Sequence, residues 1–241
     1  MRWALGSEEA PPLYWEHDNR VYDPFRPVVE FNGFESVDEM LRSRTGTINA
    51  FGQSIANAKF MVFTLGLTEH WMDAVNGLEF PMCPGTAAGR FDAERHVFRN
   101  HTYETASQSL QAAIDLARSI NPDLNIILTV SPVPMTATYS AQHVVVATMH
   151  TKSILRAVAG EFAATNSYID YFPGYEFVNS PAFKGVFFQP NQRNVTKHGI
   201  TLVMDLFEAC FEHSAQPTKP YQAHDDARCE EELLSAFRKH R

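Results

Sequence analysis

The chain has 241 residues and a mass of 27.2 kDa, which suffices for one domain whose core needs neither a metal nor disulfides. Its 20 basic and 28 acidic residues give a formal net charge of −8, which argues against nucleic acid or an anionic membrane surface as a partner. No apolar run reaches the roughly 18 residues of a membrane helix, and the start of the chain is too short for a signal peptide. Three cysteines in no zinc or disulfide spacing indicate a reducing, cytoplasmic location, and we expect no metal or other cofactor.

The first 35 residues are rich in proline and aromatic residues and show no clear periodicity. A helix is predicted directly after them, because Ser36 and Glu39 stand three positions apart as in a capping box. Residues 57–59 end this helix. Its apolar residues fall on one face, which consists of Leu41, Ile48, Phe51 and Ile55.

Three apolar runs of strand length follow, at residues 60–65, 125–130 and 168–172. The first run is continuous, which is typical of a strand buried on both faces. Helical patterns separate the runs, and Thr196 is a candidate cap for a last helix. The apolar faces of these helices carry Leu110, Ala113, Ile114 and Ala117, then Leu155, Val158 and Phe162, and finally Ile200, Val203, Met204, Phe207 and Phe211.

Alternating strands and helices predict a three-layer α/β/α domain with a mostly parallel sheet over residues 1–212. Residues 213–241 are expected to form a polar linker followed by a short surface helix. In parallel sheets, ligands bind beyond the carboxyl ends of the strands. Chemistry is therefore expected in the loops that follow Leu65, Val130 and Phe172.

The loop after Leu65 carries the richest set of polar side chains. Gly66 allows a sharp turn, and Thr68 could donate a hydrogen bond to a developing oxyanion. Glu69 or His70 could act as a base or as an orienting group. The alternative is purely local, with Thr68 or Glu69 capping the next segment.

Histidines elsewhere provide two further candidates. His143 and His150 stand seven residues apart, which is too far for a pair of metal ligands on one helix, so no metal site is expected. His198 precedes the last helix and could serve a nucleophile as a general base, although an exposed residue at a helix start is the alternative. Asp170 could pair with such a histidine or cap a turn. The sequence contains neither Gly-x-Ser-x-Gly nor Gly-Asp-Ser, and no strand precedes Ser7.

The order of these blocks resembles the GSCFA family over about residues 1–212. The segment Phe63–Trp71 looks like the family's "FTLGLTE-W" block, and Leu128–Pro134 looks like its "TVSPVP" block. Further similar blocks are Asp23–Pro27, Pro81–Gly85, His143–Thr148, Lys152–Ala157 and Tyr171–Glu176, the last of which resembles "YFPSYE".

The resemblance implies a bacterial protein similar to SGNH hydrolases, which are α/β serine esterases and acyltransferases that often act on acylated carbohydrates. It implies a serine nucleophile, an oxyanion hole and a histidine base, with Gly66–Glu69 in place of the "GxND" block and Thr68 in place of its asparagine. Counting back from Gly199 puts Asn194 where the histidine of the "DxxH" block belongs, and Asn191 where its aspartate belongs. Asn194 cannot act as a base, and His198 is in another register.

The Gly-Ser-Cys-Phe-Ala block that names the family does not occur in the sequence. We therefore expect the domain to lack its first strand and its nucleophile, and an uncovered sheet edge to permit self-association. The expected function is that of an ester hydrolase or acyltransferase family member for an acylated substrate such as a glycan ester, inactive in this form. The alternative is a non-catalytic glycan-binding or interaction module. Its site is expected to involve Glu69 and His198 as catalytic candidates, with Gly66, Thr68, His143 and Asn194 lining it.

Overall fold

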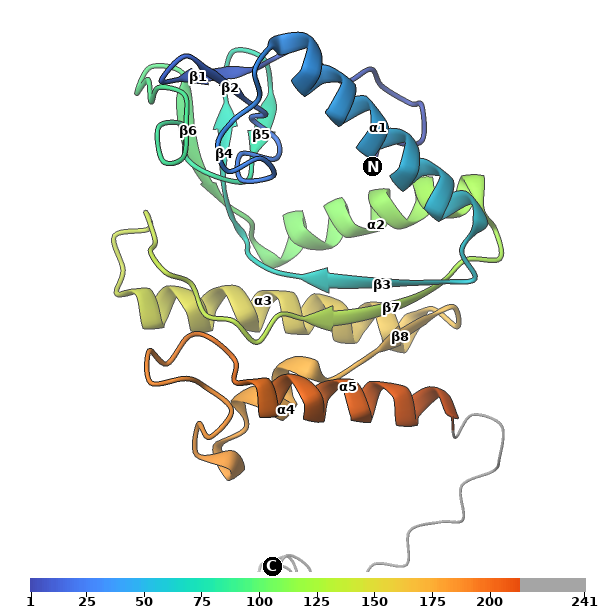
Figure 1. Ribbon diagram of the computed structural model, residues 1–241. Coiled ribbons are helices and arrows are strands. Elements are labelled where there is room, and N and C mark those ends of the chain that lie inside the picture. Colours follow the sequence, from blue (N-terminus) through green and yellow to red (C-terminus); the bar gives the residue numbers. More distant parts are fainter. Residues whose placement is uncertain (213–241) are drawn as a thin grey trace, which may run out of the picture. The chain divides into compact units, whose positions relative to one another are not determined.

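A computed structural model describes residues 1–212 of the chain (Figure 1). The chain divides into two units, Met1–Gly199 and the part that begins at Ile200, and each is treated by itself. Helix α5 (Lys197–Glu212) crosses this boundary. The predicted linker and helix in residues 213–241 lie outside the described residues. No helix among the described residues is long and apolar enough to span a membrane.

The centre of the first unit is a sheet of three parallel strands in the order β3-β7-β8 (Figure 1). The strands are β3 (Phe60–Leu65), β7 (Asn125–Val130) and β8 (Ile169–Tyr171). Two of them coincide with the predicted runs, and the third is shorter by one residue at each end. The predicted α/β class with a parallel sheet is confirmed.

Helices lie on both faces of this sheet. Ile126, Leu128 and Val130 of β7 form one core with α2 (Tyr103–Ile120) and α3 (Val144–Thr165). On the other face, Gly174 of the short helix α4 (Gly174–Asn179) lies against Thr129. Each apolar side chain buried in this way contributes about 1.5–3 kcal/mol, so β7 is the strand that anchors the sheet.

The continuous apolar run predicted that β3 is buried on both faces, and this prediction is wrong. Phe60 is 55% exposed and Val62 is 50% exposed. Their alternate neighbours Met61 and Phe63 contact the same core as β7. The reason is the position of β3 at the edge of the three-stranded sheet, where the described helix α4 packs against β7 instead.

Helix α1 (Val37–Asn57) begins directly after Ser36, the residue predicted to cap it. The Ser36 hydroxyl accepts a hydrogen bond from the Glu39 amide at 3.2 Å. The reciprocal hydrogen bond of the predicted capping box differs from the expectation. The Glu39 carboxylate accepts it from the amide of Glu35 and not from the amide of Ser36. The predicted apolar face is also partly wrong, since Phe51 is 41% exposed while Arg44 is buried.

Arg44 is buried because it forms a paired site with Asp23, whose side chain is fully buried. Its guanidinium donates to both Asp23 oxygens at 2.8 and 3.1 Å, and to the carbonyls of Pro11 and Leu13 at 2.6 and 2.7 Å. Arg26 adds a third cationic contact to Asp23 at 2.8 Å. This network ties the proline-rich N-terminal segment to α1, which explains how a segment without periodicity is ordered.

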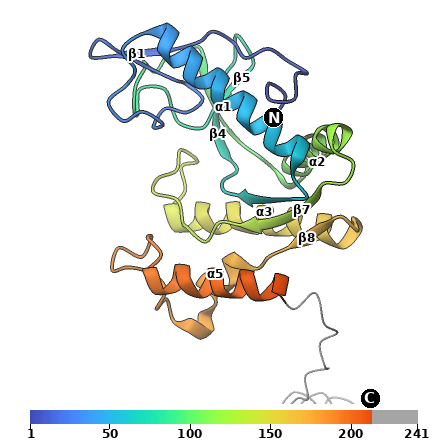
Figure 2. The ribbon, with the colours of Figure 1, turned by 45° about the vertical axis from the view of Figure 1, so that its right-hand side comes forward.

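Two small antiparallel sheets complete the first unit, and the sequence analysis missed both of them. β1 (Trp15–His17) and β2 (Arg20–Tyr22) form a hairpin. The other sheet has the order β5-β4-β6, and Figure 2 shows β4 leaving the carboxyl end of β3. Its strands are β4 (Glu69–Asp73), β5 (Leu78–Phe80) and β6 (His96–Asn100).

The turn between β4 and β5 stabilises the antiparallel sheet β5-β4-β6. The Asp73 carboxylate accepts hydrogen bonds from the amides of Val75 and Asn76. It also forms an ion pair with Arg95, in which the nitrogen and oxygen atoms are 2.6 Å apart. The hydrogen bond from Arg95 is the main reason that the pKa of Asp73 is lowered. Gly77 completes the turn with a φ of +66°, a conformation that favours glycine.

Replacing Asp23 by Asn should reveal how much the N-terminal network stabilises the fold. We expect Asp23→Asn to lower the free energy of unfolding by about 3–5 kcal/mol, because it leaves the Arg44 charge buried without its anion. Urea denaturation at neutral pH measures this, with Asp18→Asn as the matched control because its side chain is 89% exposed. A loss for Asp23→Asn no larger than for Asp18→Asn would contradict the assigned role.

Candidate functional site

The carboxyl ends of β3 and β7 lie side by side, because Leu65 is in register with Val130. The chain continues from them into Gly66 and Ser131, and the Ser131 amide donates to the Leu65 carbonyl at 2.9 Å. Two cavities open beside the loops that leave this edge. The edge is therefore the place where the fold brings separate segments together around a possible ligand.

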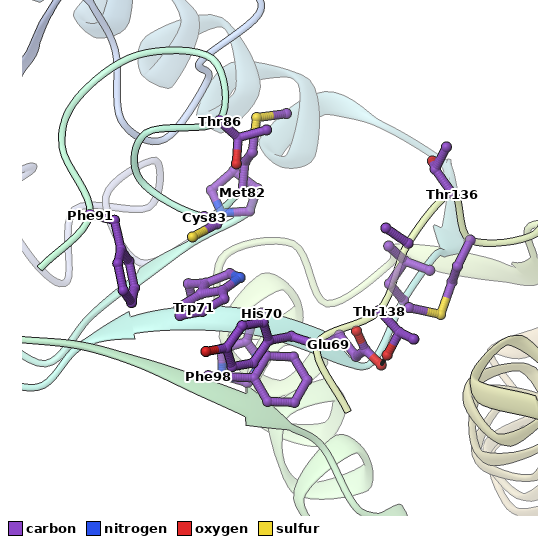
Figure 3. A pocket seen from close by; sticks show the side chains of 15 residues that line it. Glu69, His70, Trp71, Met82, Cys83, Thr86, Phe91, Phe98, Thr136 and Thr138 are labelled. Atoms are coloured by element: carbon purple, nitrogen blue, oxygen red, sulfur yellow. Dashed lines mark hydrogen bonds between the residues drawn. The ribbon is translucent and has the colours of Figure 1, made fainter. Parts of the chain in front are cut away.

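The larger cavity has a volume of about 520 Å³ and lies among β4, β6 and the loops that follow β5 and β7 (Figure 3). This volume falls in the range of ordinary ligand sites. Besides aliphatic and aromatic side chains, the lining includes a carboxylate, an imidazole, a thiol and several hydroxyls. The lining residues are Leu67, Glu69, His70, Trp71, Pro81, Met82, Cys83, Thr86, Phe91, Phe98, Met135, Thr136, Ala137, Thr138 and Tyr139.

Aromatic rings form much of the wall of this cavity. The Trp71 ring makes edge contacts with Phe91, Phe98 and Tyr139 at centroid distances of 5.4, 5.8 and 4.9 Å. Tyr139 comes from the loop after β7 and is 65% exposed, so its ring is free to contact a ligand. Such a wall suits flat or weakly polar faces, including acyl groups and the C–H faces of sugars.

A polar group lies at the end of the cavity nearest the parallel sheet. Glu69, the first residue of β4, accepts a hydrogen bond from the Thr138 hydroxyl at 2.6 Å (Figure 3). The same hydroxyl lies 2.7 Å from that of Ser140. These contacts hold the loop after β7 against β4, and they orient a carboxylate within the cavity.

His70 and His101 stack on each other with ring centroids 4.5 Å apart. The His70 ring lies 3.4 Å from the Thr68 carbonyl and 3.7 Å from the Glu79 carboxylate. Burial, and secondarily the neighbouring His70, lower the pKa of His101. His101 is consequently a neutral ring near pH 7, and His70 is the member of the pair that lines the cavity.

The smaller cavity has a volume of about 270 Å³ and shares four lining residues with the larger one. Its distinguishing group is Lys152 of α3, whose residue surface is 1% exposed. The Lys152 ammonium donates to the Gly66 carbonyl at 2.8 Å. Burial lowers the pKa of Lys152 to about 8. The shared residues are Leu67, Met135, Thr136 and Ala137, and the others are Gly66, Ser131, Val133, Pro134, Lys152 and Arg193.

Arg193 is the second cation of the smaller cavity. One of its terminal nitrogens donates to the Asn194 side chain at 3.4 Å. Its Nε is buried and has no hydrogen-bond partner in the structure. Among residues 1–212 no acidic side chain lines this cavity, so its two cations have no anionic neighbour in the described lining.

Three of the predicted site residues lie near the cavities. Gly66 lines the smaller cavity and Glu69 lines the larger one. Thr68 lies between them in the sequence, but its side chain is buried, and its hydroxyl is 2.9 Å from that of Thr151. In this conformation the Thr68 hydroxyl is directed into the protein interior.

The other predicted residues are dispersed. His143 is the N-cap of α3, where its ring nitrogen accepts from the Val145 amide at 3.3 Å. Asn194 is exposed, and its side chain accepts from Arg193. His198 is also exposed, and its ring lies 5.8 Å from that of Phe187. Within residues 1–212 no serine hydroxyl forms a hydrogen bond with a histidine ring.

The sequence analysis did not select the residues that distinguish the two cavities. Lys152 stands three positions before Leu155 and seven before Ala159, so helical spacing already placed it on the buried face of α3. The sequence alone could therefore have identified Lys152 as a buried lysine. Trp71 and Tyr139 gave no signal of this kind, because only the pairing of distant loops brings their rings together.

These features define an α/β protein with a site of ligand size at the carboxyl edge of a parallel sheet. A model of the GSCFA family matches residues 2–207, and the chain belongs to this family. No curated protein and no solved structure matches it. The resemblance carried by the sequence blocks is thus confirmed at the level of the family.

The buried lysine predicts a specific pH dependence of stability. The pKa of Lys152 is about 8 in the folded protein and 10.5 for an ordinary lysine, so the unfolded chain binds more protons between these values. The contribution of Lys152 to the free energy of unfolding should therefore rise from pH 8 to pH 10.5, by up to about 3 kcal/mol.

Denaturation of the wild type and Lys152→Met at several pH values isolates this contribution as the difference between the two curves. We expect that difference to grow with pH in this window. The corresponding difference for Lys59→Met, at an exposed lysine, should stay flat. A flat difference for Lys152 as well would show that its amine is not desolvated.

Proposed function

We propose that this GSCFA chain recognises an acyl ester, such as an acylated glycan, in the larger cavity. The observation that carries the proposal is the pairing of an aromatic wall around Trp71 with the Glu69–Thr138 polar group in one cavity. Aromatic rings bind the apolar faces of sugars and acyl groups, and a fixed carboxylate orients hydroxyls. The family's similarity to SGNH hydrolases supports ester hydrolysis or acyl transfer as the associated chemistry.

Within this proposal the chain supplies recognition more clearly than catalysis. Glu69 is the acid–base candidate that reaches the larger cavity, whereas His198 does not line either cavity. The sequence contains no Gly-Ser-Cys-Phe-Ala block to provide the expected serine. We accordingly expect the 241-residue chain to bind an acyl ester without turning it over.

A non-catalytic glycan-binding module is the second candidate. The dispersal of His143, Asn194 and His198 favours it, because a general base must lie within hydrogen-bond reach of its nucleophile. The two candidates differ in what is recognised. An ester-directed site distinguishes acylated from deacylated ligands, and a glycan-binding module binds both forms alike.

Binding of matched ligands tests the recognition role. We expect the chain to bind acetylated oligosaccharides more tightly than the same oligosaccharides after deacetylation, as measured by saturation-transfer NMR and calorimetry.

Tyr139→Ala should weaken binding about tenfold through loss of a ring contact, corresponding to about 1.4 kcal/mol. Tyr14→Ala is the matched control, because Tyr14 is also exposed and lies outside the larger cavity. Equal affinity for both ligand forms would favour the glycan-binding module, and equal affinity of both variants would reject the cavity.

Labelling with a fluorophosphonate probe tests the catalytic part. We expect no serine of the purified chain to react, and 4-nitrophenyl acetate to be hydrolysed no faster than in buffer, because no serine is activated by a histidine among the described residues. Stoichiometric labelling of one serine would overturn this expectation. Mass spectrometry would then identify the nucleophile.

A further inference from the structure

The smaller cavity contains charge that the proposed recognition of an ester does not explain. Lys152 and Arg193 both line it, and no carboxylate of the described part of the chain does. Most buried charges in proteins are paired with an opposite charge, because an isolated charge is costly to remove from water. Asp23 and Arg44 obey this rule elsewhere in the same chain. The cations of the smaller cavity stand apart because nothing in its lining neutralises them.

The hydrogen-bonding capacity of Lys152 is also largely unused. An ammonium group has three N–H donors, and one of them goes to the Gly66 carbonyl at 2.8 Å. In residues 1–212 no second acceptor is bonded to this nitrogen. The remaining donors belong to a residue that is 1% exposed and lines the cavity. They are therefore unpaired among residues 1–212, in a side chain that lines the cavity.

Arg193 gives an independent indication of the same kind. Its Nε is buried and has no hydrogen-bond partner within the described residues 1–212, although the guanidinium is charged and should donate wherever it is desolvated. Arg193 belongs to the loop that precedes α5, whereas Lys152 belongs to α3. Two cationic side chains from separate segments thus bring unused donors to one space of about 270 Å³.

We infer that the smaller cavity is an oxyanion subsite, in which Lys152 and Arg193 bind a carboxylate or phosphate group. Two charge-assisted donors from different directions are the usual way to hold such a group. The lowered pKa of Lys152 agrees with an ammonium that lacks a counter-anion in the unliganded protein. Ser131 and Thr136 line the same space and offer hydroxyls for the remaining oxygen atoms.

The inference deepens the proposed function and rests on it in one respect, namely that the oxyanion belongs to the acylated substrate. The two cavities share Leu67, Met135, Thr136 and Ala137, so they adjoin each other, and we take one ligand to extend across both. The acyl or sugar portion would contact the aromatic wall, and the anionic group would face Lys152. The substrate class is then an acylated molecule that also carries a negative charge, such as an acidic sugar.

Titration with small anions tests the subsite without any ester. We expect calorimetry to detect one site for inorganic phosphate or for acetate, each titrated separately, and the tighter anion identifies the preferred group. Lys152→Met should weaken that binding at least tenfold, and Arg193→Gln should weaken it at least threefold. Lys59→Met and Arg99→Gln serve as matched controls, since both residues are exposed and lie outside the cavity, and neither should alter the affinity. Unchanged binding in both site variants, or no binding to the wild type, overturns the inference.

Two further measurements keep the test decisive. If Lys152→Met fails to fold, NMR of the wild type labelled with ¹³C-lysine replaces it, and the signal of Lys152 but not that of Lys59 should shift with the anion. Tyr139→Ala separates this inference from the proposed function, because it should weaken ester binding and leave anion binding unchanged. Anion binding that depends on Lys152 without ester binding would reject the proposed function alone. Ester binding without anion binding would reject the subsite alone.

Discussion

The parallel pairing of β3 with β7 is the constraint on which both cavities depend. Because Phe60 pairs with Asn125 and Leu65 with Val130, the two strands run in the same direction and end at the same level. Their following loops must therefore leave the sheet side by side. Lys152 reinforces this arrangement, since its bond to the Gly66 carbonyl joins α3 to the end of β3. A shift of β3 by one residue would turn the core-facing side chains of Met61 and Phe63 to the opposite face of the sheet and displace the loop that follows β3.

Buried polar groups recur in this chain, and the completeness of their pairing distinguishes structural groups from candidate functional ones. The guanidinium of Arg44 makes four hydrogen bonds to oxygen atoms, namely both oxygens of Asp23 and two backbone carbonyls, so most of its donors are occupied within the protein. The hydroxyls of Thr68 and Thr151 likewise satisfy each other. Lys152 is buried as deeply as these groups but is bonded at one donor only. Incomplete pairing beside a cavity is what a binding site requires before its ligand arrives.

The sequence predicts the framework of this fold better than the contents of its site, and the reason is the range of the interactions. The strands at residues 60–65 and 125–130 are visible because apolar runs and caps are local signals. Burial of β3 was overestimated because a run of apolar residues does not reveal whether its strand lies at a sheet edge. The strands β4, β5 and β6 were missed because each has three to five residues, and β4 pairs with a strand more than 20 residues away, Asp73 with His96 and Glu69 with Asn100. The contact between Trp71 and Tyr139 joins segments farther apart still, so no local pattern predicts it.

The resemblance to SGNH hydrolases implies a histidine base in the loop before α5, a position at which this sequence has an asparagine. That residue, Asn194, cannot accept a proton, and its side chain accepts a hydrogen bond from Arg193. Arg193 itself lines the smaller cavity. An amide in place of a histidine removes a proton acceptor, and the neighbouring Arg193 adds a fixed positive charge. Such an exchange weakens the ability to activate a serine, and it strengthens the ability to hold an anionic ligand at the carboxyl edge of the sheet.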